Sequence, residues 1–151
     1  MRSKTDKSRK AASLVVSMRL PEASGVRLKR MARRHGWTPS DTSARLVEEG
    51  LRRQEFAWID FRDSAAGRQA YIQGSSLAVW EVAMLLRDYK QDVEAVAKHL
   101  EWPVWRVQAA VNYIGAFRDE IEEALAEYDA IDLEALKRIL PDIHVFTVPG
   151  D

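Results

Sequence analysis

The fold is decided by the stretch LVVSMRLP, residues 14–21. Every second residue of its first seven is apolar, namely Leu14, Val16, Met18 and Leu20. The residues between them are Val15, Ser17 and Arg19, of which two are polar. This period of two predicts a β-strand that buries one face. Pro21 ends the strand and suits the first turn of a helix, so we expect a helix to follow directly.

Two helices are predicted after this strand. The first runs to about His35, has a thin apolar face among many basic residues, and is closed by Gly36 as a C-terminal cap. The second runs over about residues 39–54, with Thr38 as its N-cap and Asp41 completing a capping box. Together these elements predict a strand-helix-helix unit.

A unit of this size is not expected to be stable alone. One strand and two short helices, about 45 residues in all, bury too little apolar surface for an independent fold. The strand also has no pairing partner nearby in the sequence. We therefore expect a homodimer or higher oligomer, in which strands of two copies pair antiparallel and four helices enclose one shared core.

Charge divides the chain in two. The 151 residues carry 23 Lys+Arg and 23 Asp+Glu. Residues 1–56 hold 14 basic and 6 acidic residues, a net charge of +8, whereas residues 57–151 have a net charge of −8. This asymmetry predicts a basic segment that binds a polyanion and an acidic segment with another role. Residues 1–12 are basic without apolar periodicity, so we expect a flexible arm.

The composition argues against several classes of protein. There is no cysteine, which excludes disulfides and thiolate metal sites and suits a cytoplasmic location. There is no run of about 18 apolar residues, so we expect no membrane span. The histidines His35, His99 and His144 are scattered, without carboxylates at ligand spacing. We expect no metal, no cofactor and no catalytic residue, and therefore a protein that is not an enzyme.

The second half is predicted to be helical after a short β element. Residues 69–74 have the pattern of a hairpin or edge strand, with Gly67 and Gly74 as turn signals. Helices are expected over residues 78–87, 93–100 and 104–117, with the third able to continue into the acidic stretch 119–128. Asp92 is expected to cap the second of them. A short helix over 133–140 and a strand-like stretch over 143–148 complete a fold that is mainly α.

Residues 13–56 resemble the ribbon-helix-helix repressors of the MetJ/Arc/CopG superfamily, with one intermolecular strand and two helices. In that family the paired strands enter the DNA major groove, and outward side chains read the bases. By position, the base-reading residues would be Val15, Ser17 and Arg19. The start of the second helix would hold a phosphate with Thr38 and Ser40. The resemblance together with the basic arm implies further phosphate contacts from Lys4, Lys7, Arg9 and Lys10.

Residues 57–118 resemble a small antitoxin domain with a winged or homeodomain-like helix-turn-helix fold, as in VapB-like antitoxins of type II toxin-antitoxin systems. The resemblance rests on GRQAYIQGSSLAV, residues 67–79, and on the helical part over 92–113. It implies a partner that resembles a PIN-type, metal-dependent ribonuclease toxin. The expected recognition helix over 104–117 exposes few cations within an acidic half, so we expect it to serve protein contacts and not DNA.

The tail, residues 119–151, is the expected toxin-binding segment. It alternates charged with apolar residues and could dock as an amphipathic helix followed by an added strand. The residues assigned to toxin binding are Leu136, Lys137, Arg138, Ile139, Ile143, Val145 and Phe146. Lys137 or Arg138 would neutralise the metal-binding carboxylates of the toxin. The alternative is that the tail completes the core of this protein itself.

Two functions remain open from the sequence. The first is an antitoxin that represses its own operator as a dimer on double-stranded DNA and neutralises a PIN-like ribonuclease. The alternative is a free-standing ribbon-helix-helix repressor, whose C-terminal half senses a ligand or oligomerises.

Overall fold

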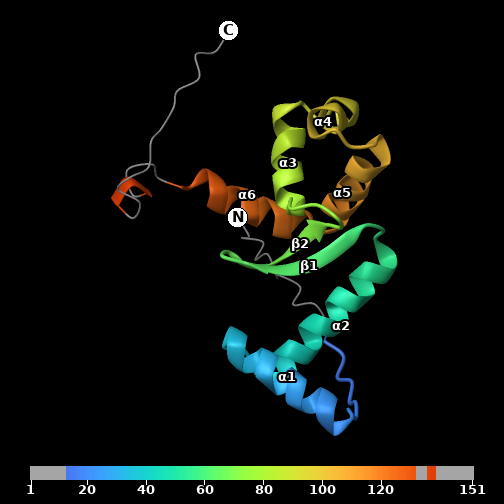
Figure 1. The fold of residues 1–151 in the computed structure, drawn as a ribbon, viewed down its shortest axis with the longest axis vertical. Helices are drawn as coiled ribbons and strands as arrows, with labels where there is room; N and C mark the ends of the chain where they lie inside the picture. The colour runs from blue at the N-terminus through green and yellow to red at the C-terminus, as the bar shows by residue number, and fades with distance from the viewer. Residues whose placement is uncertain (1–12, 132–135, 139–151) are drawn as a thin grey trace, which may run out of the picture. The chain divides into compact units, whose positions relative to one another are not determined.

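The computed structural model describes residues 13–131 and 136–138. The described chain is mainly helical and contains a small two-stranded antiparallel sheet, as Figure 1 shows. The elements are α1 (Glu22–His35), α2 (Pro39–Glu55), β1 (Ile59–Ser64), β2 (Gly67–Ile72), α3 (Val79–Asp88), α4 (Val93–Leu100), α5 (Val104–Ala116) and α6 (Arg118–Asp129). The chain divides within α2, between Leu46 and Val47, into two compact units, called unit 1 and unit 2 below.

The ends of the unit 1 helices are set by local chemistry, as the sequence predicts. Gly36 has a φ of 68°, and the N–H of Trp37 donates to the carbonyl of Ala32 at 2.9 Å, which closes α1. The N–H of Asp41 donates to Thr38 Oγ1 at 3.0 Å and caps the start of α2. The two predicted helices and both of these caps are thus confirmed.

The predicted strand over residues 14–20 is not formed within the single chain. Residues 13–20 have no regular secondary structure, and all eight are exposed. A strand needs a neighbour to accept and donate its backbone hydrogen bonds, and the predicted neighbour is a second copy of the same segment. The intermolecular strand therefore stays a prediction.

Unit 1 has almost no core of its own. Among its described residues, only Ala32 and Thr42 are buried. The Thr42 hydroxyl is satisfied locally, because it donates to the carbonyl of Thr38 at 2.9 Å. Two capped helices with so little buried apolar surface need a further surface to be stable.

Unit 2 begins with a β-hairpin after α2. β1 pairs antiparallel with β2 in a register that runs from Ile59 opposite Ile72 to Ser64 opposite Gly67. Its buried side chains are Ile59, Phe61, Ala70 and Ile72. The predicted hairpin is confirmed, but it starts ten residues before the predicted stretch. The first strand was missed because only Ile59 and Phe61 of residues 59–64 are apolar, and this alternation is too short to indicate a strand.

The helices of unit 2 pack around α5, which contacts α3, α4, α6 and both strands. α4 starts at Asp92, whose carboxylate accepts from the N–H of Ala95 at 3.0 Å, as predicted. Glu101 takes the left-handed conformation that ends α4, and Pro103 precedes α5. The chain also breaks at Phe117, so the acidic stretch forms a separate helix, α6, and does not continue α5.

The core of unit 2 is continuous from the hairpin to α6. Val79, Val82, Val96, Val107 and Ile121 are among its buried members. Leu125 of α6 packs against the same core. The segment assigned to toxin binding, residues 119–151, thus starts with a helix that completes the fold of its own unit.

Candidate nucleic-acid interface

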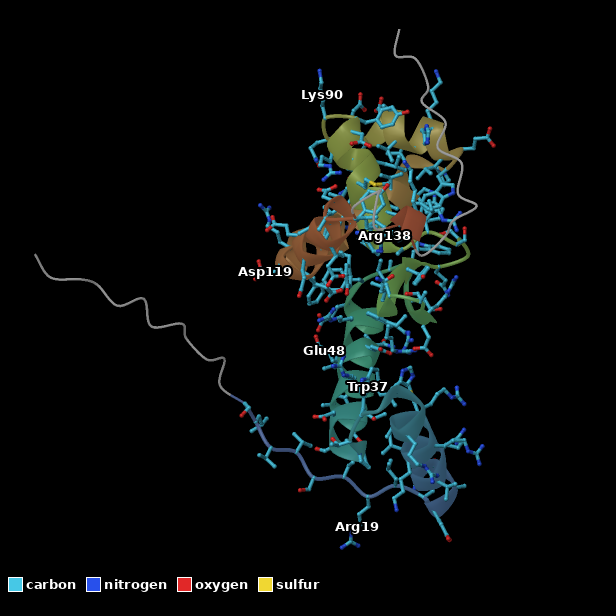
Figure 2. The ribbon with its side chains drawn as sticks, turned by 90° about the vertical axis from the view of Figure 1, so that its left-hand side faces the viewer. Arg19, Trp37, Glu48, Lys90, Asp119 and Arg138 are labelled. Carbon is cyan, nitrogen blue, oxygen red and sulfur yellow. The ribbon has the colours of Figure 1, made fainter. Side chains whose placement is uncertain are left out.

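The three predicted base-reading residues are solvent-exposed. Val15, Ser17 and Arg19 are all exposed, and the Arg19 side chain projects away from the chain in Figure 2. The intervening apolar residues are exposed as well, at 87% for Leu14 and 70% for Val16. In one copy, therefore, neither face of the segment is covered.

The start of α2 is organised by a reciprocal contact between Thr38 and Asp41. Thr38 Oγ1 accepts from the Asp41 N–H and donates to Asp41 Oδ2 at 2.7 Å. Ser40, the other predicted phosphate ligand, is exposed next to this cap. The Asp41 carboxylate partly offsets the positive end of the helix dipole, which reduces the attraction of this end for a phosphate.

Trp37 and Arg45 form a contact at this site that the sequence patterns do not reveal. The Arg45 guanidinium lies over the Trp37 ring, 4.4 Å from its centroid. The His35 ring also stacks on the Trp37 ring, at a centroid distance of 4.3 Å. The signal in the sequence is Trp37 directly before the Thr38 cap, with a cation, Arg45, about two helical turns after that cap. Arg45 thereby adds an exposed positive charge over Trp37, the residue next to the Thr38 cap.

The remaining Lys and Arg residues in the described part of unit 1 lie on α1. Its exposed basic residues are Arg27, Lys29, Arg30, Arg33 and Arg34. The arm residues Lys4, Lys7, Arg9 and Lys10 lie outside the described residues. The described part of unit 1 is thus strongly basic, which is the electrostatic requirement for binding a polyanion.

The helix α5 of unit 2, the expected recognition helix, lacks the exposed basic side chains that α1 carries. Arg106 is the only cation of α5. Its Nη2 donates to the carbonyl of Gln73 at 2.7 Å, and its guanidinium covers the Trp102 ring at 4.5 Å. Gln108 donates to Asn112 at 3.0 Å. The polar side chains of α5 are therefore engaged within the unit.

A polar network surrounds the hydroxyl of the buried Tyr113 in unit 2 and reaches the exposed carboxylates of Glu48 and Glu120. Arg52 Nη1 donates to Tyr113 Oη at 2.6 Å and to Glu120 at 2.7 Å, and Arg52 Nε donates to Glu48 at 2.8 Å. Tyr113 Oη donates to Glu120 Oε1 at 3.0 Å. Burial, and then the Glu120 carboxylate, raise the pKa of Tyr113 above its ordinary value, although Arg52 acts in the opposite direction.

A second ion pair, of the buried Glu49 with the partly buried Arg68, joins α2 to the hairpin inside unit 2. Arg68 forks onto the buried Glu49, with Nη2 at 2.8 Å from Oε2 and Nε bonded to Oε1. The hydrogen bonds and the charge of Glu49 hold the pKa of Arg68 above its ordinary value. Sequence reasoning missed both networks, because Arg52 and Glu120 are 68 residues apart and Arg68 and Glu49 are 19 apart.

The predicted toxin-binding residues are described only in part. Leu136, Lys137 and Arg138 are helical, within the predicted helix over 133–140, and the two cations are exposed. Ile139, Ile143, Val145 and Phe146 lie outside the described residues. Within the described residues, no three His, Asp or Glu side chains are grouped to hold a metal, and no helix is long and apolar enough to cross a membrane.

Comparison with protein-family models, with curated proteins and with solved structures finds no match to this chain.

The raised pKa of Tyr113 predicts a stability loss in alkali. The unfolded tyrosine ionises near its ordinary pKa of 10.0, whereas the folded one stays protonated at that pH. The stabilisation is therefore complete below pH 10 and falls as the pH rises above it, by at most about 1.4 kcal/mol per pH unit. Urea unfolding of wild type and Tyr113→Phe from pH 8 to 11 measures this. Parallel curves for the two proteins would contradict the assignment.

Proposed function

We propose that this chain is a homodimeric, operator-binding repressor that also serves as the antitoxin of a PIN-like ribonuclease. In this proposal, residues 14–20 of two copies pair as a ribbon, and unit 1 forms a ribbon-helix-helix domain. Unit 2 contributes a helix-turn-helix-like domain built on α4 and α5. The resemblance of residues 57–118 to antitoxin domains supports the second role.

One observation carries the dimer and DNA part of the proposal. The alternating segment is exposed on both faces, while unit 1 buries only two of its described residues. Pairing two such segments antiparallel would cover Leu14, Val16, Met18 and Leu20 with the helices of both copies. The same pairing would leave Val15, Ser17 and Arg19 outward on a strongly basic domain, as major-groove recognition by a β-ribbon requires.

The geometry of unit 2 supports a role in protein contacts. α4 and α5 are joined by the three residues Glu101–Pro103, a connection typical of a helix-turn-helix. Nevertheless, the one cation of α5 is bound to Gln73 and Trp102. With a net charge of −8 over residues 57–151, this half is unsuited to a phosphate backbone.

Substitutions at the neighbouring positions 17 and 18 test whether two alternating segments pair to form the dimer. Met18→Lys would place a charge in the shared core and should convert the dimer to monomer. Ser17→Lys adds the same side chain on the outward face and should leave the dimer intact. Sedimentation equilibrium of the two variants measures the difference. If both variants dimerise like wild type, or both fail to, the alternating segment does not form the dimer.

Arg19 should carry base recognition. Arg19→Ala is expected to lose about 1 to 3 kcal/mol of specific operator binding, because a bidentate contact to guanine is removed. Arg118→Ala removes an equal charge from unit 2 and serves as the matched control. The measurement is a fluorescence-anisotropy titration on the promoter DNA of this gene and on a scrambled duplex. Equal operator affinity for Arg19→Ala and wild type would exclude the strand as the reader.

The antitoxin role is tested by co-expression with the product of the adjacent gene. Because α6 completes the core of unit 2, the informative truncation removes residues 132–151 and keeps α6. We expect a small nuclease to co-purify with the full chain and to be lost on truncation. A neighbour that folds and does not co-purify with the full chain would favour the free-standing repressor.

A further inference from the structure

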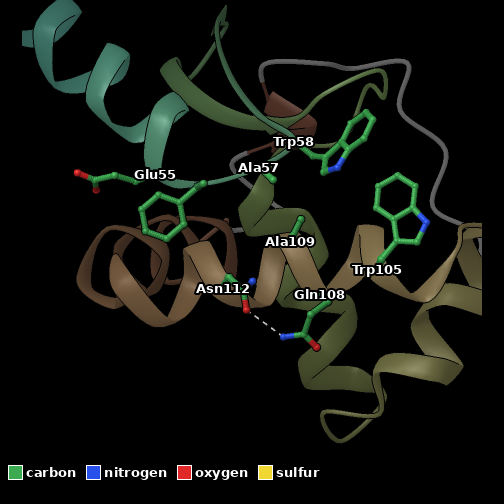
Figure 3. A pocket seen from close by; sticks show the side chains of 8 residues that line it. Glu55, Ala57, Trp58, Trp105, Gln108, Ala109 and Asn112 are labelled. Atoms are coloured by element: carbon green, nitrogen blue, oxygen red, sulfur yellow. Dashed lines mark hydrogen bonds between the residues drawn. The ribbon is translucent and has the colours of Figure 1, made fainter.

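A hollow of about 570 Å³ opens on unit 2 beside two exposed tryptophans. Trp58 follows the end of α2, and Trp105 lies in the first turn of α5. Their rings are 4.8 Å apart between centroids, and the residues are 47% and 51% exposed. Figure 3 shows the two indoles on one side of the hollow and the amides of Gln108 and Asn112 on another.

The backbone holds Trp58 in an unusual position. Its φ is 65°, in the left-handed region that bulky residues rarely adopt. The N–H of Gln73 donates to the Trp58 carbonyl at 2.8 Å and fixes this conformation against the end of the hairpin. As a result, the indole is directed outward toward Trp105 and not into the core.

The lining of the hollow favours a positively charged, partly apolar group. Phe56, Ala57 and Ala109 supply apolar surface, and neither lysine nor arginine lines the hollow. The one charged residue of the lining is Glu55, whose carboxylate points away from the indoles in Figure 3. Gln108 donates to Asn112 and keeps its own amide oxygen as an acceptor.

Elsewhere in the described chain, three half-buried aromatic rings are covered by arginines. Arg45 lies 4.4 Å above Trp37, Arg106 lies 4.5 Å above Trp102, and Arg52 lies 3.7 Å above Phe117. Trp80 instead packs against Tyr128. Within the described residues, the rings of Trp58 and Trp105 contact each other and no cation lies over them.

We propose that the hollow beside Trp58 and Trp105 binds an arginine side chain of a protein partner. A planar guanidinium stacks on an indole face and also donates to an amide oxygen such as that of Gln108. The net charge of −8 over residues 57–151 attracts such a partner and repels an acidic one. The residues that line the hollow are distinct from those proposed to contact DNA and from those assigned to toxin binding.

The test uses peptides that differ in one group. The full chain is titrated with acetyl-Gly-Arg-Arg-Gly-amide and with the same peptide carrying citrulline, which keeps the shape and lacks the charge. The indole N–H signals of Trp58 and Trp105 are followed by NMR. We expect saturable shifts of these two signals and an affinity at least about fivefold higher for the arginine peptide. A lysine peptide should bind more weakly than the arginine peptide.

A pair of variants separates the hollow from the general acidity of the unit. Trp105→Leu should weaken arginine-peptide binding at least about threefold. Tyr128→Leu replaces another exposed aromatic residue of unit 2 and should have no effect. Equal binding of the arginine and citrulline peptides to wild type would overturn the proposal. So would unchanged binding by Trp105→Leu, or peptide-free self-association that Trp105→Leu abolishes, which would assign the hollow to a second copy.

Discussion

The hydroxyl of Tyr113 is the constraint on which unit 2 depends. It is fully buried, accepts from Arg52 of α2 and donates to Glu120 of α6. A buried hydroxyl without a partner costs about 1 to 3 kcal/mol, so α2 and α6 must both pack against α5 for the Tyr113 hydroxyl to keep these two partners. The rings of Phe56, Phe61 and Phe117 pack against the ring of the same tyrosine.

Unit 1 is under a different constraint. Its helices are well defined by Gly36 and by the Thr38 cap, yet the described part buries only Ala32 and Thr42. A cap fixes where a helix begins or ends, but it supplies only about 1 kcal/mol and does not replace a core. The exposed apolar residues of 14–20 are the surface from which that core can be built, which is why the proposed function requires a second copy.

Arginine has several roles in this protein, and these roles differ between the two halves of opposite charge. In unit 2, the partly buried Arg52 and Arg68 are paired with carboxylates, and Arg106 covers a tryptophan. The carboxylates outnumber these cations, and the unit retains an acidic surface with one uncovered aromatic hollow. On α1 the basic side chains are instead exposed, where they are available to phosphates. The proposed partners therefore follow from where each charge is held.

The sequence by itself determined the helices, their caps and the mainly helical class, because periodicity, Gly36, Thr38, Asp92 and Pro103 act within a few residues of one another. It also located the basic half and the alternating segment. Only the tertiary structure decided that β1 extends over polar residues to Ser64, that α6 completes a core, and that Arg45 covers Trp37. It alone placed Arg52 on Tyr113 and Trp58 beside Trp105, because these contacts join residues far apart in the chain. Such pairings depend on how elements pack in space, and no local pattern records them.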